Sequence, residues 1–123
     1  MFVQDFIEVQ QSLEAVLDQL VAPGWLQAHV SAADVTVRPP RHRGEAMLVP
    51  FTLELETQPP VALSGDLELI AMPGAGTHLV VSASYPRPRG LVRDHDVTRN
   101  VATAVRKLLR ALDAALVPGE TLV

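Results

Sequence analysis

The C-terminal residues 96–117 read DVTRNVATAVRKLLRALDAALV, and apolar side chains recur in this stretch every three or four positions. Because this spacing lines them up along one side of a helix, the stretch predicts one long amphipathic helix. The opposite side carries charged residues, namely Arg99, Arg106, Arg110 and Asp113. The apolar stripe consists of Val97, Val101, Ala104, Val105, Leu108, Leu112, Ala115 and Leu116. A helix with one dry side needs a large apolar surface to pack against, and the rest of the chain must supply it.

The preceding part of the chain supplies strands. Apolar and polar residues alternate over residues 2–9, 35–37, 47–55, 61–69 and 79–85, which is typical of half-buried strands. Turns are predicted at Pro39-Pro40, residues 41–44, residues 57–60 and residues 73–76. Pro50 lacks an amide donor, so its strand is expected to lie at an edge or to be bulged there.

Two short helices are predicted between the first two strands. Ser12 is a suitable N-cap for residues 13–20, which carry apolar residues at helical spacing. Pro23-Gly24 ends that helix, and residues 25–33 are predicted to form the second. Asp94 or Asp96 can cap the long C-terminal helix. The order of strand, two helices, antiparallel meander and long helix predicts an α+β fold.

Composition limits the classes of function. The chain has 123 residues, which indicates one domain over residues 1–117 and a short tail over residues 118–123. A net charge of -4 argues against a nucleic-acid binder, and the absence of cysteine excludes disulfides and thiolate metal sites. No apolar run approaches the roughly 18 residues of a membrane span, and the N-terminal residues show no signal pattern. We therefore expect a cytoplasmic protein without membrane insertion.

Three features resemble the START-like, or SRPBCC, superfamily, which has the helix-grip fold and includes the polyketide cyclase/dehydrase proteins. The first is the strand ending in Ile7-Glu8-Val9, followed by Ser12-Leu13-Glu14-Ala15-Val16 and a helix pair through Pro23 and Trp25. The second is Gly65-Asp66-Leu67-Glu68-Leu69 with Gly76-Thr77-His78-Leu79, which is similar to the last hairpin of the family. The third is the long C-terminal helix, and together these features cover nearly the whole chain.

The resemblance implies a curved antiparallel sheet wrapped around the final helix, with an apolar pocket between them. Members of the superfamily mostly bind hydrophobic small molecules such as lipids, sterols, polyketides or quinones. Some catalyse cyclisation, dehydration or aromatisation in the same cavity, and others bind protein partners.

The predicted ligand-binding residues share the inner face of the strands and the apolar side of the helix. They are Phe51, Leu53, Leu67, Leu69, Val81, Ala83, Tyr85, Val101, Ala104, Val105 and Leu108. The alternative is that these residues simply fill the core, because a small domain needs most of its apolar surface in contact. Tyr85 and Asn100 could each place a hydrogen-bonding group in the pocket, and they are the weak candidates for catalysis.

Successive turns of a meander lie at alternate ends of the sheet, so residues 57–60 and residues 86–93 are predicted to lie at the same end. If a ligand enters there, Arg87, Arg89 and His95 lie near the pocket mouth and could bind an anionic group. The arginines are more simply interpreted as solvated loop charges. The run Asp94-His95-Asp96 is better explained as a helix N-terminus than as a base with an orienting carboxylate.

The other polar residues give less support to chemistry. Glu54, Glu56, Asp66 and Glu68 lie on the polar faces of their strands, where we expect solvation. In the opposite register, Glu54 and Asp66 would point inward as acid–base candidates. The four histidines lack the spacing of a metal-ligand set, so neither a metal nor another cofactor is predicted.

The sequence thus predicts a domain that binds a hydrophobic or amphipathic molecule, without catalysis. The alternatives are a polyketide cyclase- or dehydratase-like enzyme, and a module that binds a protein partner or a second copy of itself as a homodimer.

Overall fold

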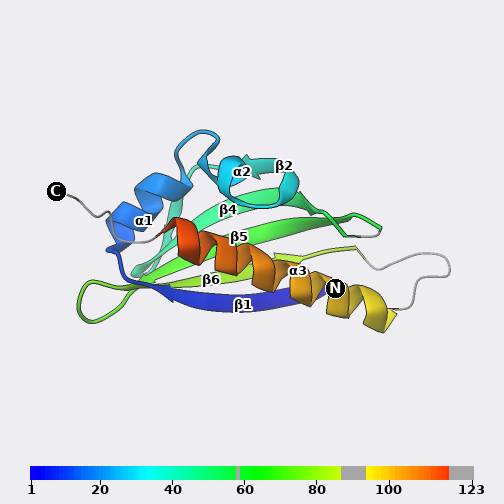
Figure 1. Cartoon of the computed structure of the whole chain (residues 1–123). Coiled ribbons are helices and arrows are strands. Elements are labelled where there is room, and N and C mark those ends of the chain that lie inside the picture. The colour runs from blue at the N-terminus through cyan, green and yellow to red at the C-terminus, as the bar shows by residue number, and fades with distance from the viewer. Residues whose placement is uncertain (58, 87–93, 117–123) are drawn as a thin grey trace.

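The structure is a computed structural model that describes residues 1–57, 59–86 and 94–116. Its strands form one antiparallel sheet, and its helices lie over one face of that sheet (Figure 1). The elements are β1 Phe2–Val9, α1 Leu13–Leu20, α2 Trp25–His29, β2 Ala32–Val37, β3 Arg41–Arg43, β4 Ala46–Leu55, β5 Val61–Ala71, β6 Thr77–Ser84 and α3 Asp94–Ala115. This is the α+β arrangement of a sheet, two short helices and a long C-terminal helix that the sequence predicts.

The strands are ordered β1-β6-β5-β4-β2, and β3 also pairs with β4. All of these pairs are antiparallel, and β4, β5 and β6 form a meander. Strand β1, which comes first in the chain, therefore lies beside β6 at one edge, while β2 lies at the other. The long helix α3 crosses the covered face near β1 (Figure 1).

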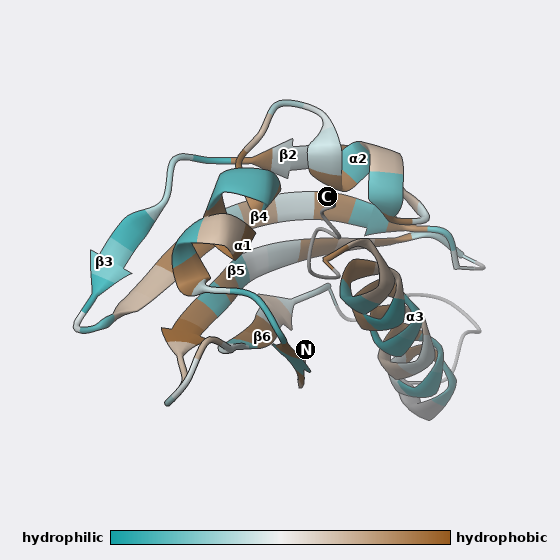
Figure 2. Cartoon of the chain, turned by 60° about the vertical axis from the view of Figure 1, so that its left-hand side comes forward, coloured by the Kyte–Doolittle hydropathy of each residue, from teal (hydrophilic) through white to brown (hydrophobic). Residues whose placement is uncertain are grey.

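The core lies between the covered face of the sheet and the three helices. Alternate side chains of β4, β5 and β6, such as Leu53, Leu67 and Val81, point into it and are at most 4% exposed. They form one cluster with Val16 and Leu26 and with the apolar side of α3. Figure 2 shows the resulting separation of hydropathy, with brown and teal residues on different sides of α3.

The burial of α3 confirms the predicted stripe. Val97, Val101, Val105 and Leu112 are at most 4% exposed, whereas the charged residues of the predicted polar side are all exposed. Leu109 is also fully buried, although the predicted stripe did not include it. The helix begins at Asp94 rather than Asp96, and it ends at Ala115.

The start of α1 is as predicted. The Ser12 hydroxyl accepts a hydrogen bond from the Ala15 N–H at 3.2 Å, and the Ser12 backbone is extended. This is N-cap geometry, in which the side chain satisfies a donor that the first turn leaves without a partner. It fixes where the chain leaves β1 and turns over the sheet.

The predicted extent of the second helix, residues 25–33, was wrong at its C-terminal end. Helix α2 stops at His29, because Val30 is extended and Ala32 already pairs with Leu55 in the sheet. The Gln27 side chain stabilises this change of direction. It donates to the Ala32 carbonyl at 2.8 Å and accepts from the Val35 N–H at 3.0 Å.

Residues 41–44 were predicted to be a turn, but Arg41–Arg43 form the strand β3 and pair with β4. All three residues are exposed, so no apolar alternation marks the strand in the sequence. The turn comes at Gly44, whose φ of +62° suits a residue without a side chain.

Pro50 lies in β4, which has β5 on one side and β2 and β3 on the other, so the prediction of an edge strand was wrong. Its carbonyl accepts from the Arg38 N–H at 2.9 Å. In a strand the N–H and C=O of one residue point to the same side. Arg38 continues the register of β2 opposite Pro50, so the missing donor of Pro50 faces Arg38, and the reciprocal bond of this pair cannot form at the point where β2 ends.

Candidate functional site

A pocket of about 540 Å³ opens between α3 and the end of β4; we call it the α3 pocket. Its volume is within the range of roughly 300–1,000 Å³ that is typical of small-molecule sites. Most of its lining side chains are exposed or half-buried, so it is open to solvent. The lining residues are Ser31, Glu56, Thr57, Asn100, Thr103, Ala104, Lys107, Leu108 and Ala111.

One wall of the α3 pocket is a single stripe of the helix. It consists of two adjacent rows, Asn100, Ala104 and Leu108 and then Thr103, Lys107 and Ala111, and within each row the residues repeat every four positions along the axis. This stripe borders the buried side of α3, with Leu108 at 8% exposure as the residue common to both. Because the side chains of Ala104 and Ala111 are small, they leave space beside the helix at those two positions.

The facing wall comes from two other segments. Glu56 and Thr57 directly follow β4, and Ser31 joins α2 to β2. The Thr57 hydroxyl donates to the Pro59 carbonyl at 2.7 Å, which holds the chain at the beginning of this turn. Thr57, the first residue of the predicted turn over residues 57–60, lines the pocket, whereas Pro59 and Pro60 are not among its lining residues.

The structure gathers all eleven predicted ligand-binding residues into the core. Ten of them are at most 8% exposed, and Ala104 packs against the same cluster while half-buried. Only Ala104 and Leu108 also line the α3 pocket. The others belong to the same buried cluster as the apolar side of α3; they are Phe51, Leu53, Leu67, Leu69, Val81, Ala83, Tyr85, Val101 and Val105.

The two weak catalytic candidates differ in exposure, since Tyr85 is buried and Asn100 is exposed. Tyr85 is 4% exposed, and its hydroxyl donates to the Thr98 hydroxyl at 3.4 Å. Asn100 is exposed and lines the α3 pocket, so its amide can contact a molecule bound there. Of the predicted pocket-mouth residues, Arg87 and Arg89 lie outside the described residues. The backbone of His95 belongs to α3, but its side chain also lies outside the description.

The carboxylates of β4 and β5 point away from the core. Glu54, Asp66 and Glu68 alternate with buried residues and are half-exposed on the other face of the sheet, as the solvated interpretation expects. Glu56 differs, because it follows the end of β4 and lines the α3 pocket. Within the described ranges 1–57, 59–86 and 94–116, three or more potential metal ligands nowhere come together.

Sequence reasoning missed Ser31, Glu56, Thr57, Thr103, Lys107 and Ala111 as lining residues, and it assigned Glu56 to the solvated face of its strand. A signal for four of the lining positions was present. Lys107 and Ala111 lie next to Ala104, which belongs to the predicted apolar stripe, and on the same side of the helix as Asn100. This side of the helix carries two alanines, a neutral amide and one cation. Such a mixture of small, polar and charged residues is typical of a partly buried side of a helix. The residues of the facing wall carry no such signal, because only the folded chain brings them there.

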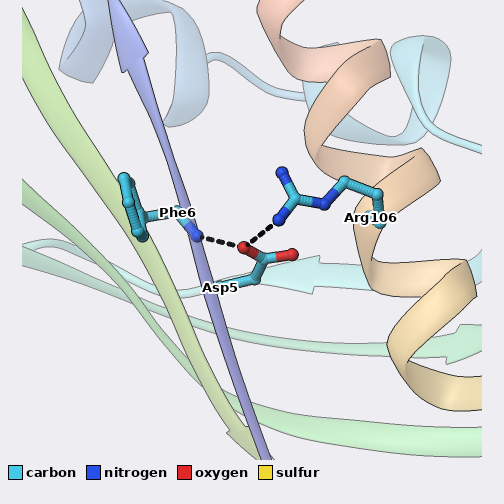
Figure 3. Close-up of polar contacts among 3 residues, drawn as sticks. All are labelled: Asp5, Phe6 and Arg106. Carbon is cyan, nitrogen blue, oxygen red and sulfur yellow. Dashed lines mark hydrogen bonds and ion pairs between the residues drawn. The ribbon is translucent and has the colours of Figure 1, made fainter. Parts of the chain in front are cut away.

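An ion pair links α3 to the edge strand β1 (Figure 3). An Asp5 carboxylate oxygen accepts from the Arg106 guanidinium at 2.7 Å and from the Phe6 N–H at 2.8 Å. The side chains of Asp5 and Arg106 are 18% and 48% exposed, so the pair is partly shielded from solvent. Arg106 was assigned to the charged side of α3, and the structure shows that this side chain also ties the helix to the edge strand β1.

A second, smaller pocket of about 250 Å³ lies between the α1–α2 turn and β2. Its lining is mostly apolar, and its main polar group, the Gln27 amide, is already bonded to the backbone of β2. Within the described residues, no helix is both long enough and apolar enough to span a membrane.

Comparisons with known proteins bear on the fold. No family model matches the chain, and no curated protein matches it. The crystal structure of TTHA0849 from Thermus thermophilus aligns with a TM-score of 0.60 at 15% identity, covering 94% of this chain and 97% of that one. A START superfamily protein from Mycobacterium smegmatis aligns with a TM-score of 0.58 at 13% identity, with 94% and 96% coverage.

The Zhui aromatase/cyclase from Streptomyces sp. R1128 aligns with a TM-score of 0.53 at 10% identity, covering 94% of this chain and 93% of that one. Such low identities show the fold alone. The chain has the START-like, helix-grip fold that its sequence predicts.

Proposed function

We propose that this helix-grip domain binds a hydrophobic or amphipathic small molecule in the α3 pocket, between the end of the sheet and α3. The observation that supports this most directly is the pocket itself, at about 540 Å³. Ala104, Leu108 and Ala111 offer an apolar floor, and the polar residues around them can orient a ligand. A concave site with an apolar floor and a few polar groups is the usual form of a ligand site. Lipids, polyketides and quinone-like molecules fit this description.

The residue types that line the α3 pocket favour binding without catalysis. Among the residues that the structure describes, its lining contains no histidine or tyrosine, and the Tyr85 hydroxyl bonds to Thr98. Asn100 and Glu56 remain as groups that could touch a reacting molecule. A cyclase- or dehydratase-like activity is therefore the second candidate, supported by the fold shared with the Zhui aromatase/cyclase. If Asn100→Ala left turnover on a polyketide panel unchanged, Asn100 would have no catalytic role.

An interaction module is the third candidate, and one observation favours it. Phe2 and Phe6 lie on the uncovered face of β1 and are 63% and 52% exposed. Large exposed aromatic side chains are typical of protein interfaces. Sedimentation velocity tests the homodimer: a species that dissociates when both residues are changed to Ser would support it, and a monomer at all concentrations would rule it out.

A cytoplasmic location, without nucleic acid or membrane insertion, stays a prediction.

The ligand-binding proposal is tested with phenylnaphthylamine, an uncharged fluorescent apolar probe. The wild-type protein should bind it saturably at a single site. Ala104→Trp places an indole in the α3 pocket and should abolish binding, and Ala111→Trp should do the same from the next turns of the helix. Ala102→Trp is the matched control, because Ala102 is exposed and does not line the pocket. Far-UV circular dichroism establishes that each variant is folded. Unchanged binding to folded Ala104→Trp and Ala111→Trp would refute the proposal.

A further inference from the structure

The α3 pocket contains two charged side chains of opposite sign. Lys107 comes from α3, and Glu56 follows β4 on the facing wall. Among the described residues, neither takes part in an ion pair. Two other cations of the helix differ, because Arg99 pairs with Asp96 and Arg106 with Asp5, while Arg110 does not line the pocket. Lys107 is thus a cation that lies in the pocket wall with its charge still available.

The surroundings of Lys107 suit a molecule with an apolar body and one charged end. Ala104 precedes Lys107 by three positions and Ala111 follows by four, so all three lie on one line of the helix. Leu108 lies beside them at 8% exposure. A ligand body that rests on the alanines and Leu108 would bring its end group to the ammonium. The lysine stem can extend along that apolar floor while its head stays at the rim.

Glu56 limits the charge that such a ligand can carry. The carboxylate lies on the wall that faces Lys107, and it repels an anion that approaches it. A phosphate ester or polyphosphate would place further negative charge toward Glu56. The remaining polar groups of the lining, from Ser31, Thr57, Asn100 and Thr103, are neutral and can bind hydroxyl or carbonyl groups. Lys107 can therefore bind one anionic group, and Glu56 disfavours a second negative charge in the same pocket.

We infer that the α3 pocket selects a compact amphipathic monoanion, such as an organic carboxylate, whose charged group binds Lys107 while its apolar body lies on Ala104, Leu108 and Ala111. This inference rests on the proposed function, and it adds the charge and polarity of the ligand to it.

Two probes with the same aromatic body test the inference. Anilinonaphthalene sulfonate is a monoanion, and phenylnaphthylamine is its uncharged counterpart. Lys107→Gln should weaken binding of the sulfonate about threefold to tenfold, because a charge-assisted contact is lost from a partly exposed site. Glu56→Gln should strengthen sulfonate binding about twofold, because a repulsive charge is removed. The affinity for phenylnaphthylamine should change less than about twofold in both variants, since no charge is involved.

The control variants separate charge from shape. Lys107→Arg keeps the positive charge and should retain sulfonate binding, whereas Lys107→Met keeps the stem without the charge and should behave as Lys107→Gln. Arg110→Gln removes an exposed cation of the same helix that does not line the pocket, and it should leave both affinities unchanged. Raising the salt concentration should weaken sulfonate binding to the wild-type protein and to Arg110→Gln, but much less to Lys107→Gln.

The outcomes distinguish this inference from the proposed function. If Ala104→Trp abolishes binding of both probes but Lys107→Gln leaves their affinity ratio unchanged, the monoanion inference is overturned and the binding function stands. The same conclusion holds if Lys107→Gln weakens both probes equally. If folded Ala104→Trp and Ala111→Trp still bind both probes with wild-type affinity, the proposed function fails, and the inference fails with it.

Discussion

Gly65 is the position where a single methyl group should most disturb the sheet. It lies in β5, opposite Phe51 of β4 and Ala83 of β6. A Cβ atom built on Gly65 would lie 2.0 Å from the Ser82 carbonyl oxygen and 2.6 Å from the Ala83 Cα, and both are backbone atoms of β6. Ordinary contact begins at 3.4 Å, so β5 and β6 would have to separate locally by about 1.4 Å.

The cost of that separation can be estimated. A shift of this size takes neighbouring β5–β6 bonds beyond hydrogen-bond range, and two lost bonds cost about 1–3 kcal/mol. Forcing an extra methyl group into a packed region costs about 1–3 kcal/mol more. Together these contributions span about 2–6 kcal/mol, so Gly65→Ala should lower the free energy of unfolding by about 4 kcal/mol, a large part of the 5–15 kcal/mol typical of a domain.

Urea denaturation followed by far-UV circular dichroism measures this effect. With a slope of about 1.5–2 kcal/mol per M, the midpoint should fall by about 2 M. Gly44→Ala is the matched control. Gly44 has φ +62° and open space around it, so a methyl group there meets only backbone strain of about 1 kcal/mol. A midpoint for Gly65→Ala no lower than that for Gly44→Ala would refute the reasoning from the close approach of β6.

Two further predictions concern how α3 is held. In a double-mutant cycle of Asp5→Ala and Arg106→Ala, we expect a coupling free energy of about 0.5–1 kcal/mol, because the ion pair is only partly shielded from solvent. Chemical denaturation of the wild-type protein, the two single variants and the double variant measures this coupling. Additive effects of the two substitutions would mean that the pair does not tie α3 to β1. Leu109→Ala should lower the free energy of unfolding by about 2–5 kcal/mol, because it opens a cavity at a fully buried position, whereas exposed Arg110→Ala should change it by less than about 0.5 kcal/mol. Thermal or urea unfolding distinguishes these two variants, and equal losses would contradict the assignment of Leu109 to the core.

Much of the fold could be predicted because the periodicity of apolar residues indicates which side of a helix or strand is buried. The bounds of β1, the Ser12 cap of α1 and the buried side of α3 all follow from local spacing and capping chemistry. Strand β3 could not be predicted in this way. Its three exposed residues carry no alternation, and only pairing with β4 makes them a strand.

The position of the pocket was harder to predict for a related reason. Alternation in β4, β5 and β6 identifies the side chains that face α3, but it does not tell whether the space between them is filled. The structure places nearly all of those side chains in the packed core. The α3 pocket instead lies at the border of the stripe, where Lys107 and Ala111 meet Glu56 and Thr57. That meeting depends on how far α3 lies from the end of β4, which no local pattern encodes.

One local feature of β1 indicates where α3 lies. Asp5 is the charged residue among Val3, Ile7 and Val9, which share the inner face of β1. A carboxylate at an inward position needs a partner or a hydrogen-bond donor. The long helix carries Arg106 on its charged side, and these two residues together could have predicted which edge of the sheet α3 approaches.

The most direct test of the central claim is a map of where an apolar molecule binds. Backbone amide resonances would be followed by NMR while phenylnaphthylamine is added to the wild-type protein. The account predicts saturable shifts in the α3 stripe from Asn100 to Ala111, together with Ser31, Glu56 and Thr57, and no such shifts in Ala104→Trp. Shifts confined to the uncovered face around Phe2 and Phe6, or no saturable shifts at all, would contradict it.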